Sequence, residues 1–177
     1  MSPRPFVLVA ALSLLAFAVP RPAAEDVPRA KELLKHFAGT WDVEMTFAGM
    51  PPSKGTETNH LLTHGLVLVT EYRAPMGPGQ EFEGHGLMGF NPRTGAWTSV
   101  WADSMDPNIS INEGTWSADG KTFTVEDEID MGMGPVRMAM VTTITDADHH
   151  TFTMSDSKAA AGAAPMVKAT YARRAGP

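Results

Sequence analysis

The hydrophobic and polar positions of the chain follow a helical period only around residue 30, and a period of two from residue 40 onward. The helical part begins near Pro28, a residue tolerated in the first turn of a helix, and ends at Gly39. Its apolar positions recur every three or four residues and are Ala30, Leu33, Leu34 and Phe37. One short N-terminal helix is therefore expected before the rest of the fold.

The first segment with a period of two spans residues 40–47. It places polar side chains on one face and apolar ones on the other, which is typical of a strand with one buried side; the apolar ones are Trp41, Val43, Met45 and Phe47. Turns and loops rich in Gly, Pro, Asp or Ala separate it from further segments, which predict strands over residues 56–63, 66–73, 81–90, 96–103, 109–116, 122–129, 135–145, 150–156 and 166–174.

About ten strands joined mostly by short connections form an antiparallel meander. Such a sheet must stack as a sandwich or close as a barrel to remove its edges. The near absence of long crossovers favours the barrel. The predicted fold is all-β, an antiparallel up-and-down barrel of about ten strands with a short N-terminal helix, in one domain over residues 25–177.

Tracing the alternation through the strands predicts which side chains face the barrel axis. The apolar ones are Trp41, Val43, Met45, Leu66, Leu68, Trp97, Trp101, Ile109, Ile111, Phe123, Val125, Val136, Met138, Met140, Ile144, Phe152, Met154, Val167 and Tyr171. The same phase turns some polar groups inward: Thr70, Tyr72, Ser99, Asp103, Glu113, Thr142 and Arg173. A shift of one residue would invert any of these strands.

Polar groups among wide aromatic walls indicate a partly solvated cavity, because a buried polar group without a partner costs about 1–3 kcal/mol. Barrels of about eight or more strands can hold a small ligand. The lining expected to bind it comprises Tyr72, Trp97, Trp101, Asp103, Glu113, Met138, Met140, Phe152 and Met154. Gly84 and Gly86 leave one face of their strand bare, which favours barrel curvature over a ligand approaching the backbone.

The first two dozen residues predict export. Arg4 precedes an apolar run from Phe6 to Val19, which is shorter than the about 20 residues that cross a bilayer. Small residues follow, and cleavage after Ala24 is favoured over cleavage after Ala18 because the chain then turns polar. Residues 1–24 therefore read as a secretory signal peptide, with an uncleaved membrane anchor as the alternative. The expected location is the bacterial periplasm or the medium.

Composition narrows the function classes. The chain has no Cys, which excludes structural disulfides, thiolate zinc sites and a Cys nucleophile. Loss of Arg4 and Arg21 with the signal peptide takes the formal net charge from −6 to −8. An acidic protein with scattered basic residues is poorly suited to nucleic acid or to anionic membranes, so neither is expected as a partner.

Several segments resemble a known family. Gly39-Thr40-Trp41 resembles the Gly-x-Trp opening of the calycin superfamily, to which lipocalins belong, and the resemblance implies that Arg173 packs across Trp41. Over the whole mature chain the sequence is similar to a bacterial domain-of-unknown-function family numbered 1579. The segments that carry this are Ala38-Gly39-Thr40-Trp41-Asp42-Val43, Glu71-Tyr72, Phe82-Glu83-Gly84, Gly89-Phe90, Trp101-Ala102-Asp103-Ser104-Met105, Glu113-Gly114-Thr115, Asp119-Gly120-Lys121-Thr122 and Ala169-Thr170-Tyr171-Ala172-Arg173-Arg174.

The resemblance implies a barrel in a periplasmic or secreted setting and brings no established activity. The chain departs from the family at Met131-Gly132-Met133-Gly134, where relatives have a longer polar hairpin. It also lacks the Gly-x-Trp-x-Gly-x-Gly pattern of haem-binding nitrobindin-like barrels, so no haem or other cofactor is expected.

Three functions remain open. The favoured one is binding of a small apolar or amphipathic molecule inside the barrel. An enzyme is the second, with Asp103 and Glu113 as an acid/base pair, although both could instead bind loop amides at the barrel mouth. Copper handling is the third, since thioether and imidazole suit copper(I); its residues would be Met131, Met133, Met138, Met140, His149 and His150.

Ordinary explanations compete with the metal hypothesis. Methionine fills irregular cores and adapts to varied ligands, so core packing or a soft apolar lining is favoured for Met138 and Met140. Two further histidines, His60 and His64, lie about 13 Å apart on a strand, which is beyond a shared metal ion. Solvated or core-satisfied histidines are expected there and at His85, and no metal ligand is assigned.

Overall fold

The computed structural model describes residues 26–130, 134–160 and 162–176. The elements are α1 (Asp26–Phe37), β1 (Gly39–Phe47), β2 (Ser53–Leu61), β3 (Val67–Gly77), β4 (Gln80–Phe90), β5 (Trp97–Asp103), β6 (Ser110–Trp116), β7 (Thr122–Asp130), β8 (Pro135–Ile144), β9 (His149–Asp156) and β10 (Val167–Arg173). The proposed signal peptide, residues 1–24, lies outside the described residues. Within the described part of the chain, no helix is long and apolar enough to cross a bilayer.

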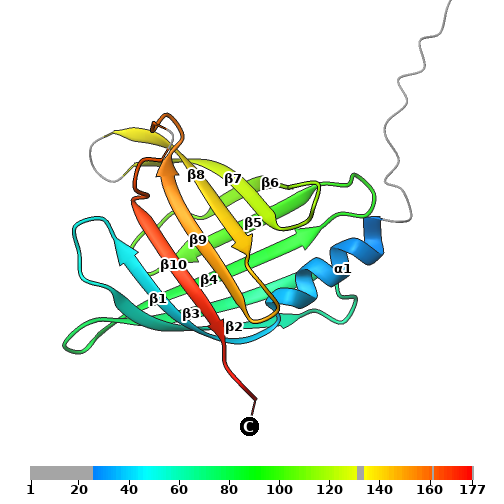
Figure 1. Ribbon diagram of the computed structural model, residues 1–177, viewed down its shortest axis with the longest axis horizontal. Helices are drawn as coiled ribbons and strands as arrows, with labels where there is room; N and C mark the ends of the chain where they lie inside the picture. The colour runs from blue at the N-terminus through cyan, green and yellow to red at the C-terminus, as the bar shows by residue number, and fades with distance from the viewer. Residues whose placement is uncertain (1–25, 131–133, 161, 177) are drawn as a thin grey trace, which may run out of the picture.

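The ten strands form one closed barrel in which each strand pairs with its neighbours in the chain and β1 pairs with β10 (Figure 1). Every pairing is antiparallel. The predicted ten-stranded up-and-down barrel with an N-terminal helix is confirmed. The strand bounds differ from the prediction by up to four residues, most at the end of β3, which reaches Gly77. Strand β2 starts three residues earlier than predicted, at Ser53, because Ser53 to Gly55 pair with β1.

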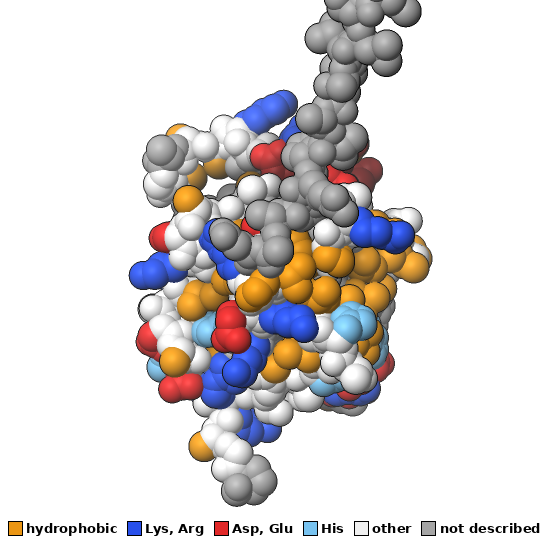
Figure 2. Space-filling model, turned by 90° about the vertical axis from the view of Figure 1, so that its right-hand side faces the viewer, with side chains coloured by type: hydrophobic (Ala, Val, Ile, Leu, Met, Phe, Trp, Pro, Cys, Tyr) orange, Lys and Arg blue, Asp and Glu red, His pale blue; other side chains and the backbone are white. Residues whose placement is uncertain are grey.

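Helix α1 lies across one end of the barrel (Figure 1). Asp26 in its first turn and Lys35 in its last turn complement the helix dipole. Its buried face, which includes Leu34 and Phe37, packs with inward side chains at that end of the strands: Leu61, Leu68, Met88, Trp97, Trp116 and Ile144. Seen from this side, hydrophobic side chains gather near the centre of the end, among charged and His side chains (Figure 2).

Three glycines without side chains make room for aromatic rings inside the barrel. A Cβ at Gly114 would lie 2.0 Å from Cζ of Phe123, and one at Gly84 would lie 2.4 Å from Cζ2 of Trp101. At Gly86 the nearest contact of such a Cβ is again Trp101, at 3.1 Å. The bare face of β4 is thus covered by the indole of Trp101 from the neighbouring strand.

The barrel wall is least continuous between β6 and β7. These strands pair over only three positions, from Gly114 to Trp116, although each is at least seven residues long. Beyond them, the Asn112 side-chain amide donates to the Asp127 carboxylate at 2.9 Å. A side-chain bridge therefore takes the place of the backbone ladder in this part of the wall.

The one clear error in the predicted interior is the choice of which face of β6 points inward. Ile109 and Ile111 are 64% and 69% exposed, and Glu113 is exposed on the same outer face. The inward residues are instead Ser110, Asn112, Gly114 and Trp116. The physical reason is the ring of Phe123, which needs the space at Gly114 and fixes the phase of the strand.

Candidate functional site

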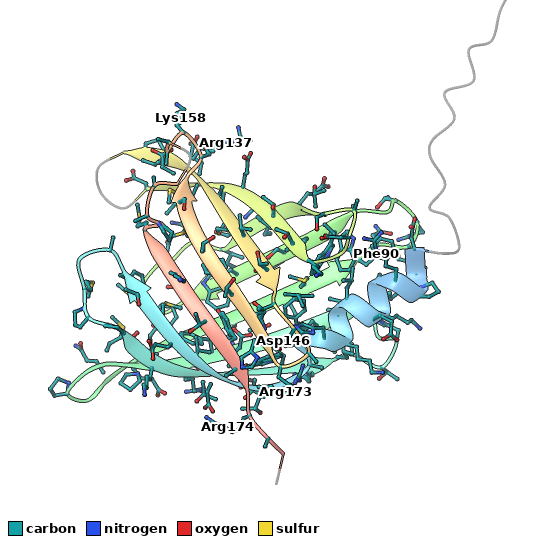
Figure 3. The ribbon with its side chains drawn as sticks, in the orientation of Figure 1. Phe90, Arg137, Asp146, Lys158, Arg173 and Arg174 are labelled. Carbon is teal, nitrogen blue, oxygen red and sulfur yellow. The ribbon has the colours of Figure 1, made fainter. Side chains whose placement is uncertain are left out.

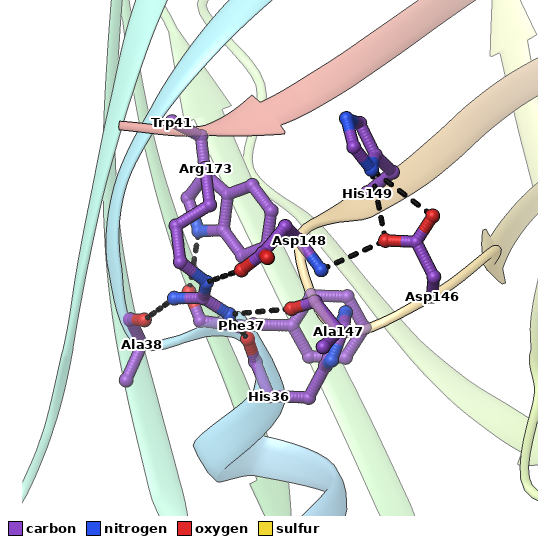
Figure 4. Close-up of polar contacts among 9 residues, drawn as sticks. All are labelled: His36, Phe37, Ala38, Trp41, Asp146, Ala147, Asp148, His149 and Arg173. Atoms are coloured by element: carbon purple, nitrogen blue, oxygen red, sulfur yellow. Dashed lines mark hydrogen bonds and ion pairs between the residues drawn. The ribbon is translucent and has the colours of Figure 1, made fainter. Parts of the chain in front are cut away.

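Arg173 of β10 fastens the helix-covered end of the barrel. Its guanidinium carbon lies 4.2 Å from the ring centroid of Trp41, the contact that the calycin resemblance implies. The same guanidinium donates to Asp148 Oδ1 at 3.1 Å and to three backbone carbonyls, those of His36 (2.6 Å), Ala38 (2.7 Å) and Ala147 (3.2 Å) (Figure 4). A fixed positive charge therefore satisfies carbonyls at the C-terminus of α1, where the helix dipole favours a cation.

Two inward side chains donate hydrogen bonds to the carbonyl oxygen of the last residue of α1. Trp41 Nε1 donates to the Phe37 carbonyl oxygen at 2.8 Å, and Asn59 Nδ2 donates to it at 3.1 Å. Stacking completes this end, because His150 lies edge-on to Trp41 at 4.4 Å and parallel to Tyr171 at 4.2 Å between ring centroids. Phe90, Asp146 and Arg173 all lie at the α1 end, whereas Arg137 and Lys158 lie at the opposite rim (Figure 3).

A polar cluster lies deeper in the barrel, and we call Glu57, Asn59, Tyr72 and Tyr171 the inner polar cluster. Asn59 Nδ2 donates to Glu57 Oε1 at 2.7 Å, and Glu57 is the register partner of Tyr72 on β3. Tyr72 reaches back over β2, since a Cβ at Gly55 would lie 2.5 Å from its hydroxyl. The cluster therefore draws on three strands: β2 and β3, which pair with each other, and β10, which β1 separates from β2.

The surroundings of this cluster change its acid–base properties. Burial raises the pKa of Glu57 to about 7, against a smaller opposing effect of the bond from Asn59. Burial, and then the Glu57 charge, raise the pKa of Tyr72, and the pKa of Tyr171 is raised for the same reasons and by Tyr72. Burial also lowers the pKa of His150 to about 3, assisted by His36 and Arg173, so this imidazole is neutral at ordinary pH.

Two polar atoms of the cluster are buried without a hydrogen-bond partner among the described residues. They are the Tyr72 hydroxyl and Asn59 Oδ1. Tyr72 is only 3% exposed and Asn59 only 4%. Because most buried polar groups in proteins are hydrogen-bonded, two such atoms beside the Glu57 carboxyl make the inner polar cluster a candidate binding site. The other three in the described residues, on His36, Trp116 and His150, belong to the end covered by α1.

The walls next to the cluster are apolar and only partly buried. Phe82 contacts Tyr72 edge-on at 5.7 Å between centroids, and Trp101 covers the adjacent glycines of β4. Several inward side chains remain partly accessible although they face the barrel axis: Met45, Phe82, Trp101, Met140, Phe152 and Met154. The interior therefore offers both an apolar lining and unsatisfied polar groups.

The structure places eight of the nine predicted lining residues on the inward face: Tyr72, Trp97, Trp101, Asp103, Met138, Met140, Phe152 and Met154. They do not form one group. Trp97 packs below α1, with ring centroids 5.1 Å from Phe90 and 5.8 Å from Trp116, and Met138 is fully buried. The remaining six lie further from α1 along their strands, and among them Tyr72 belongs to the inner polar cluster.

The predicted pairing of Asp103 with Glu113 is wrong. Glu113 is exposed on the outer face of β6, on the other side of the sheet from Asp103. The Asp103 carboxylate accepts the Trp101 indole N–H at 2.9 Å and two loop amides, those of Met105 (2.8 Å) and Asp106 (3.0 Å). Asp103 thus anchors a loop and an indole at the barrel mouth, and no acid/base pair forms.

The residues of the copper hypothesis do not converge either. His149 is exposed and binds Asp146, with Nδ1 2.8 Å from Oδ1, whereas His150 is buried in the aromatic stack. Met131 and Met133 lie outside the described residues. Among the described residues no group of three or more His, Cys, Asp or Glu side chains could hold a metal ion.

A hollow of about 520 Å³ on the outer surface is a weaker candidate. It lies over β1, β2 and β10, and its lining includes Asp42, Glu44, Lys54, His149 and Thr170. The buried unpartnered polar atoms in the described part of the chain all belong to other residues. The interior of the barrel is therefore the site that the structure favours.

Sequence reasoning missed Glu57 and Asn59. The predicted strand at residues 56–63 has polar residues on both faces, so its pattern did not indicate which face points into the barrel. The one usable signal is Leu61, a half-buried apolar residue that lies on the same face of the strand as Glu57 and Asn59. Tyr72 comes beside Glu57 through the pairing of β2 with β3, and Tyr171 comes near it only when β1 and β10 pair to close the barrel.

Comparisons with known proteins agree with this fold. Residues 28–173 match the profile of the family described as "Protein of unknown function (DUF1579)". The S-type phycobiliprotein lyase CPES from Guillardia theta is 10% identical, with a TM-score of 0.53, over 83% of this chain and 93% of that one. A redesigned β-barrel, mFAP0, bound to DFHBI, is 14% identical, with a TM-score of 0.42, over 78% of this chain and 99% of that one. A search of curated proteins gives no match.

Proposed function

The chain belongs to the DUF1579 family, whose function is unknown, and we propose that it is an exported protein that binds a small apolar or amphipathic molecule inside its barrel. One observation carries the proposal. The inner polar cluster leaves the Tyr72 hydroxyl and Asn59 Oδ1 without partners, next to apolar walls that remain partly accessible. Ligand pockets typically combine such a lining with a few polar groups that fix orientation.

The two ends of the barrel support different roles. The end under α1 is held by Arg173 and by aromatic stacking, so it acts as a rigid floor. The accessible side chains lie further from α1, toward the rim that carries Arg137 and Lys158 (Figure 3). A ligand that enters from this rim would place its apolar part against Trp101, Phe82 and the methionines, and its polar part at the inner polar cluster.

Native mass spectrometry of the protein purified from a bacterial periplasm tests the proposal. We expect a co-purified organic mass that is lost on denaturation. The matched variants are Met140→Trp, which fills the interior, and Val141→Trp, which introduces the same side chain at the next residue of β8, on the outer face. The first should lose the retained mass and the second should keep it. Protein that is free of any organic mass and shows no ligand-induced rise in melting temperature would overturn the proposal.

Export rests on the signal-like segment at residues 1–24 and has its own test. We expect the full chain to appear in the periplasmic fraction or the medium, shortened at the N-terminus, and a chain that begins at Glu25 to stay in the cytoplasm. N-terminal sequencing of the exported protein would also identify the cleavage site. An unshortened, membrane-bound product would instead support the anchor alternative.

A further inference from the structure

The ionisable side chains inside the barrel are mostly acidic, and they differ in how well they are satisfied. Asp103 accepts three hydrogen bonds, and Asp127 accepts two, from Asn112 and from the Glu128 amide. Arg173 is committed to carbonyls and Asp148 at the helix end. Glu57 has only the bond from Asn59, and no Lys or Arg of the described residues forms an ion pair with it.

The orientation of the Asn59 amide is fixed by its neighbours. Its nitrogen faces the Phe37 carbonyl oxygen and Glu57 Oε1, which both accept hydrogen bonds when Glu57 is ionised. The amide nitrogen supplies both of its protons there, so Oδ1 must be the buried atom that has no partner. The inner polar cluster thus presents an unused acceptor at Asn59 in addition to the carboxylate of Glu57.

The Tyr72 hydroxyl adds a third oxygen. It is buried, unpartnered and placed over Gly55, which precedes Glu57 by two residues on the same face of β2. Residues two apart on a strand are separated by about 7 Å. Glu57 lies between Gly55 and Asn59 on this face of β2, so the carboxylate is the central acceptor, with the Tyr72 hydroxyl on one side of it along the strand and Asn59 on the other.

We propose that the ligand carries a protonated primary amine on an apolar body, and that the Glu57 carboxylate, held by Asn59, binds the ammonium group with the Tyr72 hydroxyl beside it. This inference rests on the function proposed above and specifies its ligand. An ammonium group has three N–H donors and no acceptor, which complements the acceptor oxygens of Glu57 and Tyr72. Its charge offsets the buried carboxylate, which has no other cationic partner, and the rings of Tyr72 and Tyr171 favour a nearby cation.

Other ligand chemistries fit this cluster less well. A carboxylate or phosphate would lie beside Glu57, and like charges in a poorly solvated site repel strongly. An alcohol of the same size can donate only one hydrogen bond and leaves the charge of Glu57 uncompensated. The apolar body of the ligand would contact Phe82 and Trp101, which lie next to Tyr72.

The test compares three probes that share one phenylpropyl group: 3-phenylpropylamine, 3-phenylpropanol and 4-phenylbutyrate. Binding is measured by calorimetry at about pH 8, where the amine is protonated. We expect the wild type to bind the amine about tenfold or more tightly than the alcohol, which is the size of effect expected for a hydrogen-bonded charge, and the butyrate least tightly. Glu57→Gln should reduce the preference for the amine to within about threefold.

Two further variants complete the test. Tyr72→Phe keeps the ring and removes one acceptor, so it should weaken amine binding about three- to tenfold and leave alcohol binding nearly unchanged. Glu44→Gln removes an exposed carboxylate of β1 and should bind all three probes like the wild type. Equal binding of the three probes, or an unchanged preference in Glu57→Gln, would overturn the amine assignment and leave the proposed function standing. If no probe binds, the amine assignment fails, and the retained mass in native mass spectrometry decides separately on the proposed function.

Discussion

Replacing Glu57 by Gln should stabilise the protein above neutral pH and have little effect in mild acid. Burial raises the pKa of Glu57 from its ordinary 4.5 to about 7. An acid whose pKa is raised by folding binds its proton more tightly in the native state. Ionisation of Glu57 therefore destabilises the fold of the wild type. This destabilisation is absent below pH 4.5, grows as the pH rises and is complete above about 7.

The magnitude follows from the two pKa values. Their difference is about 2.5, and each pKa unit corresponds to about 1.4 kcal/mol, so ionised Glu57 costs about 3 kcal/mol at about pH 8. At about pH 5 the same values give less than about 1 kcal/mol. Gln keeps an oxygen that accepts the bond from Asn59, so the variant removes the charge and preserves the packing. For a domain of this size, about 3 kcal/mol raises the melting temperature by about 6–12 °C.

The assay is urea unfolding of the wild type, Glu57→Gln and Glu44→Gln at both pH values. Glu44 is an exposed carboxylate of β1, and its variant should follow the wild type at each pH. The reasoning is refuted if Glu57→Gln and the wild type change in parallel between about pH 5 and pH 8, since Glu57 would then titrate as an ordinary carboxyl group. A stabilised variant that has lost amine binding would show that the acid is kept for binding and not for stability.

Three further predictions concern the frame of the site. Arg173→Lys should lower the free energy of unfolding, measured in urea, by about 2–3 kcal/mol, because Lys cannot reach the backbone carbonyls and the indole at once. The control Arg174→Lys, on the surface, should change it much less. Similar losses in the two variants would contradict the role of Arg173 in holding the α1 end. Gly114→Ala should lower the free energy of unfolding by about 1–3 kcal/mol, because the added Cβ would overlap the ring of Phe123. The same substitution should cost less in a Phe123→Leu protein, and additive effects of the two substitutions would disprove the overlap. His150 has a pKa of about 3 in the native state, so below about pH 6.5 the unfolded chain takes up a proton that the native state does not. Between about pH 7 and pH 5 the free energy of unfolding of the wild type should therefore fall by about 2 kcal/mol relative to that of His150→Phe. If the free energies of unfolding of the two proteins change in parallel with pH, His150 is not buried in the neutral form.

Much of the interior could be predicted because most strands contrast their two faces. In β1, Trp41, Val43 and Met45 alternate with polar residues, and the structure turns all three inward. The same holds for Met138 and Met140 on β8. Where one face is buried, a slip of one residue would expose the whole apolar set, so the hydrophobic effect fixes the phase.

The pattern failed where the two faces of a strand do not differ in this way. In β6 the apolar Ile109 and Ile111 suggested the inward face, but the space that Phe123 requires at Gly114 reverses it. In β2 both faces are polar, so nothing along the strand distinguishes Glu57 from its neighbours. The acid/base hypothesis for Asp103 and Glu113 depended on the β6 phase and was lost with it.

The sequence by itself determined the barrel, its ten strands and the absence of disulfides, because period, turn chemistry and composition are local properties of the chain. The contact of Arg173 with Trp41 was implied by the calycin resemblance and not by these local patterns. Only the tertiary structure decided where the unsatisfied polar groups lie. Glu57 and Tyr72 meet through the pairing of β2 with β3, and Tyr171, far away in the sequence, joins them because β1 pairs with both β2 and β10 when the barrel closes. The raised pKa of Glu57 arises from burial by those distant strands, and no pattern of neighbouring residues could encode it.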